Sequence, residues 1–155
     1  MPNWCYNVVR FQGDAHLISE TERFFKAMAA REKQQLCGQL PDFATVRDDH
    51  FFCIQWKDNA LHYETRWCPN TYQLVTIADH LHVNFKHNYE ETEMLIYGQA
   101  TYSNGKLSTV DLDPADFELY QYDGQQDDFL FEGKHYPDYA TILEILLERK
   151  MQYLP

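Results

Sequence analysis

Histidine is the residue type that most readily suggests chemistry in this sequence, because seven are present. His80, His82 and His87 lie close together in the chain, and His62 falls on another predicted strand. Zinc sites need ligands whose spacing lets them converge. His80 and His82 straddle a predicted helix-to-strand junction, and no H-E-x-x-H motif accompanies them. The sequence therefore predicts solvent-facing histidines, with no metal ion and no other cofactor.

Carboxylates are the second group with catalytic potential, since Glu90, Glu91 and Glu93 lie almost side by side. Paired carboxylates can share general acid and base work. These three fall at a predicted bend between strands, where charge favours solubility, so a solvated turn is expected. The sequence also contains no G-x-S-x-G motif, no P-loop and no G-x-G-x-x-G motif. No catalytic residue is therefore assigned, and enzymatic activity is not indicated.

The cysteines Cys5, Cys37, Cys53 and Cys68 are widely spaced. Without a Cys-x-x-Cys pair they do not suggest a zinc ribbon or a thioredoxin-like motif, and reduced, mostly buried thiols are expected. No secretory hydrophobic region follows Met1, and no apolar run approaches the roughly 20 residues that span a bilayer. The sequence therefore predicts a cytoplasmic protein without a membrane partner.

Charge argues against nucleic acid as a partner, because 24 acidic residues against 13 basic ones give a net charge of −11. Such a surface repels phosphate backbones. The RNA-recognition module has a similar order of elements, but it stacks bases on aromatic residues of a basic strand. Here Tyr6 and Phe11 lie on the first strand, and the equivalent third strand instead carries His62, Glu64 and Arg66.

The elements that would position these groups follow from hydrophobic periodicity. Residues 3–12 are predicted to form a strand that ends at Gly13, and Asp14 can cap the next helix. That helix is expected to fade between residues 31 and 35. Its apolar stripe recurs at helical spacing at Leu17, Thr21, Phe24, Phe25 and Met28.

Two strands are expected next, at residues 51–56 and 61–67, and alternation in the second indicates one buried face. Pro69 ends this strand. Asn70, with Gln73 three residues later, forms a variant of the capping box and starts a second helix.

The following segments read as strands and a hairpin. Residues 83–89 alternate again, with apolar or aromatic positions at Val83, Phe85, His87 and Tyr89. Strands at 94–102 and 107–110 flank Asn104-Gly105, and Asn-Gly is the strongest short hairpin signal. A type I′ turn with positive φ at Gly105 is therefore predicted.

The order strand, helix, strand, strand, helix, strand in the first ninety residues is the ferredoxin-like split βαβ pattern. We predict an α+β fold in which a ferredoxin-like split βαβ sheet is extended by a β-hairpin and a C-terminal helix. Residues 1–155 are expected to form a single domain, with a core at 1–110 and an acidic extension at 111–155. That extension should be irregular as far as Pro137, where Asp138 caps the last helix.

Three segments carry a resemblance to a known family. The chain begins with MPNWCYN, residues 63–70 read YETRWCPN, and residues 89–106 read YEETEMLIYGQATYSNGK. These resemble the M-P-N-W-C-x-N start, the T-x-W-S-P-P segment and the Y-E-E strand with its N-G hairpin in the YubB family, the ferredoxin-like domain of phage and conjugative-plasmid proteins. The resemblance covers roughly residues 1–107. It implies the fold and a bacterial mobile-element setting, and it implies no reaction.

The sequence departs from that family in two places. CIQWKDN, at residues 53–59, stands where the family commonly has N-W-G-T-K-W, and Asn70 replaces the second proline of the T-x-W segment. An activity carried by the missing segment would be absent here.

The split βαβ topology makes the three segments converge, because the first strand lies between the third and fourth and antiparallel to both. Asn3, Trp4 and Cys5 should therefore lie beside Trp67, Cys68 and Pro69, with Tyr89 and Glu90 on the other side. One interpretation is that these residues lock the strand-to-helix corner, with tryptophan rings in the core. The other is a small site in which Asn3 and the helix N-terminus offer donors to an anionic or carbonyl group, between tryptophan walls. The candidate binding residues are Asn3, Trp4, Cys5, Trp67, Cys68, Asn70 and Glu90.

Three functions are compatible with these observations. The acidic surface and the missing catalytic motifs favour an accessory protein of a mobile element or its bacterial host that binds another protein. The first alternative is a small-ligand binder or enzyme that uses the cluster around Trp4 and Trp67. The second is an acidic DNA-mimic decoy, which requires carboxylates aligned on one face.

Overall fold

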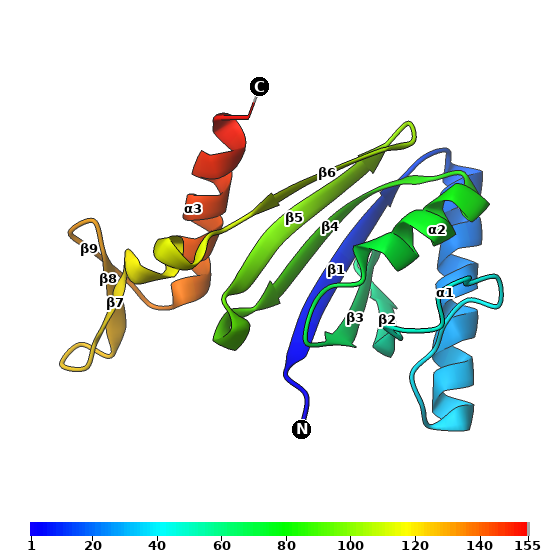
Figure 1. Cartoon of the computed structure of the whole chain (residues 1–155), viewed down its shortest axis with the longest axis horizontal. Coiled ribbons are helices and arrows are strands. Elements are labelled where there is room, and N and C mark those ends of the chain that lie inside the picture. The colour runs from blue at the N-terminus through cyan, green and yellow to red at the C-terminus, as the bar shows by residue number, and fades with distance from the viewer. Residues whose placement is uncertain (155) are drawn as a thin grey trace.

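The computed structural model describes residues 1–154 and is drawn in Figure 1. None of the described helices is long and apolar enough to cross a membrane. In chain order, the helices and strands are β1 (Trp4–Gln12), α1 (Ala15–Gln35), β2 (Phe52–Lys57), β3 (Ala60–Arg66), α2 (Thr71–Leu81), β4 (Asn84–Glu91), η1 (Thr92–Met94), β5 (Ile96–Ser103), β6 (Lys106–Asp111), η2 (Pro114–Glu118), β7 (Gln121–Asp123), β8 (Asp128–Phe131), β9 (Lys134–Tyr136) and α3 (Tyr139–Gln152).

Six strands form one antiparallel sheet in the order β2-β3-β1-β4-β5-β6. β1 runs through its middle and pairs with β3 on one side and β4 on the other, as predicted. The β5–β6 hairpin extends the sheet beyond β4 (Figure 1). The predicted α+β class, the split βαβ order, the added hairpin and the C-terminal helix are confirmed.

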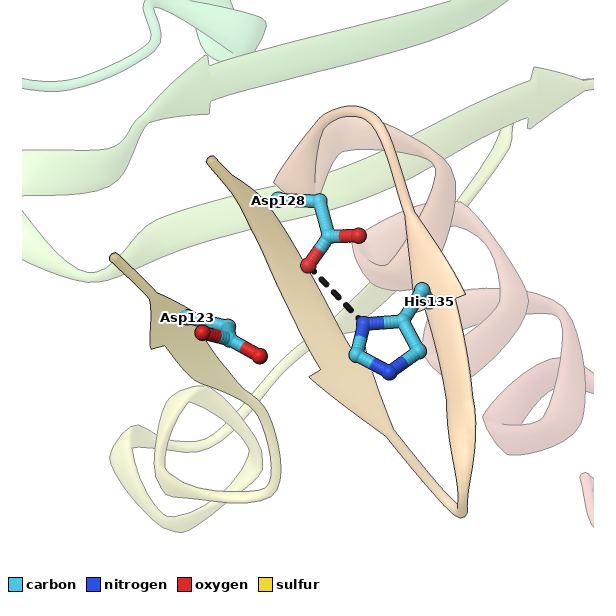
Figure 2. A group of neighbouring side chains, drawn as sticks. All are labelled: Asp123, Asp128 and His135. Carbon is cyan, nitrogen blue, oxygen red and sulfur yellow. Dashed lines mark hydrogen bonds and ion pairs between the residues drawn. The ribbon is translucent and has the colours of Figure 1, made fainter. Parts of the chain in front are cut away.

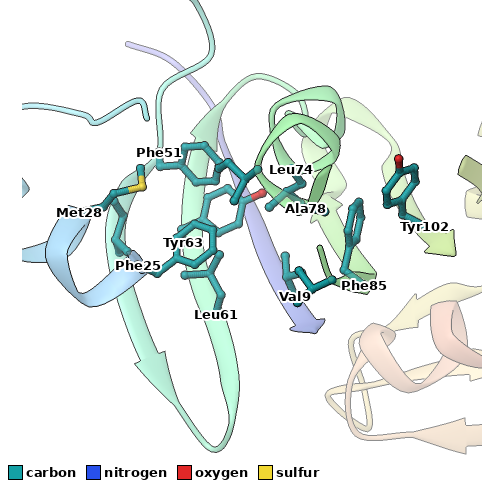
Figure 3. Packing of buried hydrophobic residues seen from close by; sticks show 13 residues of the cluster. Val9, Phe25, Met28, Phe51, Leu61, Tyr63, Leu74, Ala78, Phe85 and Tyr102 are labelled. Atoms are coloured by element: carbon teal, nitrogen blue, oxygen red, sulfur yellow. The ribbon is translucent and has the colours of Figure 1, made fainter. Parts of the chain in front are cut away.

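Alternation along β1 divides the sheet into a helix-covered face and an opposite face. Cys5 and Val9 are buried on the helix-covered face, whereas Tyr6 is exposed on the other side. α1 and α2 together cover the buried face, to which α1 contributes Phe25 and Met28 (Figure 3). Full burial of such a side chain contributes roughly 1.5–3 kcal/mol, so this cluster holds the sheet and both helices together.

The segment predicted to be irregular, residues 111–137, instead contains a 3₁₀ turn, η2, and a three-stranded antiparallel sheet, β7-β8-β9. Strands of three or four residues are too short for alternation to be recognised in a sequence. α3 packs between this small sheet and the hairpin, burying Ile142 and Leu143 beside Tyr97 of β5 and Val110 of β6 (Figure 1). The extension therefore covers part of the face opposite α1 and α2.

Two local predictions at chain turns are also confirmed. Asn104 and Gly105 have φ values of 53° and 79°, the two positive values that a type I′ turn requires. The Asp138 side chain accepts a hydrogen bond of 2.9 Å from the backbone N–H of Thr141 and so caps α3.

Candidate functional site

The start of β1 lies between the ends of β3 and β4. Trp4 pairs with the last residue of β3, and Tyr6 pairs with Glu90 of β4. The carbonyl oxygen of Asn3 accepts a hydrogen bond of 2.8 Å from the backbone N–H of Trp67, just past β3. The structure thus brings the three family-like segments together at one end of the sheet.

Beneath this corner, a buried polar network joins β1, β3, β4 and α2. The Nδ2 of Asn7 donates to the Cys5 carbonyl and to the Thr65 hydroxyl, both at 3.0 Å. Its Oδ1 lies 2.7 Å from Nε2 of His87, and because that oxygen only accepts, Nε2 carries the ring proton. Nδ1 of the neutral ring then accepts a hydrogen bond of 3.1 Å from the Thr71 hydroxyl. Every polar atom of the Asn7 and His87 side chains is therefore used inside the protein.

The prediction of solvent-facing histidines is wrong for His87, which is fully buried. Burial lowers the pKa of its ring from 6.5 to about 3, because the charged form would lose its hydration. His80 and His82 are exposed, and His62 is half-buried. Within residues 1–154, none of these four belongs to a group of three metal-ligating side chains.

Asn70 occupies the N-cap position of α2, as predicted, but its side chain does not cap the helix. It is fully buried, accepts a hydrogen bond of 2.7 Å from the Tyr63 hydroxyl and donates to the Asp49 carbonyl at 3.1 Å. Gln73 likewise donates to carbonyls of the loop at residues 46–48 instead of closing a capping box. These two amides anchor the loop before β2, so Asn70, one of the candidate binding residues, uses its side chain within the protein.

The expectation of mostly buried thiols is also wrong, because Cys37, Cys53 and Cys68 are exposed and only Cys5 is buried. Burial raises the pKa of Cys5 to about 12. Partial burial also raises the pKa of Cys68, whose carbonyl accepts a hydrogen bond of 2.8 Å from Thr65. Because the thiolate is the nucleophilic form, a raised pKa lowers the reactivity of both thiols at neutral pH.

Trp4 and Trp67 line separate hollows and do not form the walls of one site. Trp67 is 48% exposed and lines a hollow of about 440 Å³ together with His50, Phe52 and Arg66. Trp4 is half-buried, with its ring edge-on to Phe52 at a centroid distance of 5.1 Å. The Arg66 guanidinium lies 4.7 Å from the Phe52 ring centre and 6.0 Å from that of Trp4.

The hollow beside Trp4 encloses about 310 Å³, and its lining includes Asn3, Trp4, Tyr6, Tyr139 and the glutamates at positions 90, 91 and 93. Burial, together with the charge of Glu91, raises the pKa of Glu90. Glu91 is only 8% exposed, and its carboxylate accepts a hydrogen bond of 2.9 Å from the backbone N–H of Glu93. The predicted solvated turn therefore applies to Glu93, which is exposed, and not to Glu91.

Carboxylates beside aromatic rings suit a cation. Within residues 1–154, no lysine or arginine forms an ion pair with any of the three glutamates. An ammonium or guanidinium group would relieve the repulsion between the carboxylates, and the faces of aromatic rings attract cations within about 6 Å. We call the cavity defined by Asn3, Trp4, Tyr6, the three glutamates and Tyr139 the acidic hollow.

Two aromatic members of the acidic hollow, Tyr6 and Tyr139, are not among the binding residues predicted from the sequence. The exposure of Tyr6 could have been predicted, because alternation along the first strand places it on the face opposite to the buried residues. The position of Tyr139 could not, because no local pattern shows that the start of α3 returns to the beginning of β1.

Part of this site lies within a recognised domain. A family model described as the ferredoxin-like domain in Api92-like protein matches residues 49–132. The matched segment runs from the loop before β2 through β8 and includes the three glutamates of the acidic hollow. No curated protein and no solved structure gives a significant match.

Proposed function

The chain belongs to the family of the ferredoxin-like domain in Api92-like protein, whose description names a fold and no reaction, and we propose that it acts by binding a basic segment of another protein in the acidic hollow. The resemblance of three segments to YubB proteins supports a role as an accessory protein of a mobile element or of its bacterial host, in the cytoplasm. The absence of a recognised catalytic motif is compatible with this role.

One observation carries the proposal: three glutamates without an ionic partner in the described chain line the same hollow as Trp4, Tyr6 and Tyr139. A volume of about 310 Å³ lies at the small end of ligand pockets, which suits a lysine or arginine side chain better than a large cofactor. The net charge of −11 would also speed the encounter with a basic partner at low ionic strength.

The two alternative functions receive less support from the geometry. A ligand site or active site shared by Trp4 and Trp67 is disfavoured because these rings line different hollows. A DNA-mimic decoy needs a spaced row of carboxylates that copies a phosphate backbone, whereas the glutamates of the acidic hollow are interleaved with aromatic rings.

Binding of a labelled peptide tests the proposal. Fluorescence polarisation with a short lysine- and arginine-containing peptide, at low salt, should give saturable binding that an acidic peptide of equal length does not show. Glu90→Gln and Trp4→Ala should each weaken binding about fivefold, as expected for the loss of one ionic or cation–π contact near 1 kcal/mol. Glu118→Gln, an exposed glutamate on η2, is the matched control and should leave the affinity unchanged.

Equal affinity for the acidic and basic peptides, or an unchanged affinity for Glu90→Gln, would contradict the proposal. The mobile-element setting has a separate test in the genomic neighbourhood. Plasmid or phage genes beside the coding sequence support that setting, and a housekeeping operon would count against it.

A further inference from the structure

Three side chains with metal-ligating atoms gather on the small sheet, far along the chain from the acidic hollow. Asp123 ends β7, Asp128 begins β8 and His135 lies on β9. Figure 2 shows their polar groups turned toward one another from three adjacent strands. One ligand atom from each lies within 4.8 Å of those from the other two. The Nδ1 of His135 is 2.9 Å from Oδ1 of Asp128.

The register of this sheet gives an independent reason to expect a cation here. Asp123 and Asp128 are directly opposed residues of the β7–β8 ladder. Like charges in directly opposed positions destabilise a sheet. Within residues 1–154 no lysine or arginine pairs with either carboxylate, and the Asp128 side chain is only 17% exposed, so solvent screens its charge incompletely. The neighbouring Asp127 does not share in this cluster, because it accepts a hydrogen bond of 2.6 Å from Tyr122.

We propose that Asp123, Asp128 and His135 bind a divalent transition-metal ion, with zinc as the best match. Two carboxylate oxygens and one imidazole nitrogen are ordinary zinc ligands at about 2.0–2.2 Å, and copper, nickel or iron accept the same donors. Ligand atoms around a tetrahedral ion with bonds of about 2.1 Å lie about 3.4 Å apart, so side-chain rotations must draw the observed set, which lies within 4.8 Å, closer together.

The ion would link all three strands of the small sheet and neutralise the opposed aspartates. In the metal-free chain Nδ1 of His135 donates its proton to the Asp128 carboxylate. On metal binding that proton would be released, or the ring would adopt its other tautomer, so that a neutral His135 binds the ion through Nδ1 with its proton on Nε2. Because His135 is 39% exposed at the edge of the cluster, a tetrahedral ion would keep its fourth position open to water or to a ligand from a partner. None of these three residues lines the acidic hollow, so the proposed metal site does not depend on the proposed function.

Calorimetric titration of the untagged, chelator-treated protein with zinc chloride tests this site. One ion per chain is expected to bind, and thermal unfolding should shift to higher temperature because the ion binds the folded chain. Asp123→Asn and His135→Gln should each weaken zinc binding by at least about tenfold. Asp127→Asn is the matched control and should bind zinc like the unmodified protein.

The exposed cysteines offer zinc a competing set of ligands, so the titration includes the triple variant Cys37→Ser, Cys53→Ser and Cys68→Ser. Retained binding in this variant supports the proposed site. Loss of binding in it, no saturable binding by the unmodified protein, or unchanged affinity in both Asp123→Asn and His135→Gln would overturn the inference. Far-UV circular dichroism without zinc verifies that each variant is folded.

Discussion

Asn7 illustrates how a polar residue can occupy the centre of a buried strand. A buried amide costs stability unless its hydrogen bonds are made. Asn7 donates twice and accepts once within the protein. A slip of β1 by one residue would turn Asn7 toward the other face and leave the His87 N–H without an acceptor. The network therefore favours one register of β1 against its neighbours.

His87 also determines part of the dependence of stability on pH. Its folded-state pKa, about 3, lies below the ordinary value of 6.5. As pH falls through 6.5 the unfolded chain gains a proton that the folded chain does not, so stability is lost. Between pH 7 and pH 4.5 this loss should be about 2–3 kcal/mol. Urea unfolding at both pH values measures this loss in the unmodified protein and in His87→Gln. The free energy of unfolding should fall less in His87→Gln, by about 2–3 kcal/mol. Equal losses in the two proteins would contradict the lowered pKa of His87.

The sequence contained the evidence for the burial of His87 but not for the role of Asn70. His87 alternates with Phe85 and Tyr89, which predicts that all three share one face. The motif of Asn70 and Gln73, by contrast, is also the local signal for a capping box. Their actual acceptors lie in the loop at residues 46–49, and sequence spacing does not reveal contacts with a loop so distant in the chain.

Among the elements, the β5–β6 hairpin offers the cleanest test of local geometry. Gly105 has a φ of 79°, and a Cβ atom added there would meet nothing within 4 Å. Gly105→Val should therefore lower the free energy of unfolding by about 1–2 kcal/mol through backbone strain alone. Gly105→Asn is the matched control, because asparagine tolerates the left-handed conformation. Equal melting temperatures for the two variants would show that the turn does not require this conformation.

Element length decides which parts of the fold the sequence could predict. β1, β3 and β4 have seven to nine residues, and their alternation identifies both the strand and its buried face. β7, β8 and β9 have only three or four residues each, too few for an alternation to be recognised. The cluster of Asp123, Asp128 and His135 was therefore missed together with the sheet that assembles it.

At the scale of the whole molecule, the two faces of the large sheet have different covers. α1 and α2 cover one face, and α3 covers the β5–β6 part of the other, with the small sheet on the far side of α3 (Figure 1). Lys150 holds α3 to the segment after β6, because its Nζ donates to Asp113 and Asp116 at 2.8 Å. This docking brings Tyr139 to the acidic hollow, so the proposed binding surface depends on the C-terminal extension.

A Leu→Ala substitution should loosen different parts of the protein, depending on which of its two large hydrophobic clusters is changed. Leu74 is fully buried in the cluster between the large sheet and the helices α1 and α2, and Leu143 is fully buried in the cluster between α3 and the strands β5 and β6. Leu143→Ala and Leu74→Ala should each cost about 2–5 kcal/mol. Because α3 contacts the large sheet mainly through β5 and β6, Leu143→Ala should accelerate amide hydrogen exchange more in α3 than in β1. Leu74→Ala should accelerate exchange strongly in β1. Equal acceleration of α3 and β1 by Leu143→Ala would mean that the two clusters open together.

The central position of β1 in the sheet affects co-translational folding. β1 is translated before either neighbour, since its partners lie at residues 60–66 and 84–91. Until both have emerged, the nascent chain displays an unpaired apolar strand that includes Val8, Val9 and Phe11. Pairings this distant in sequence close slowly, and unpaired strand edges invite association with other chains. The first strand therefore remains open to association with other chains until residues 60–91 have been synthesised, and the β5–β6 hairpin and α3 follow later in the chain.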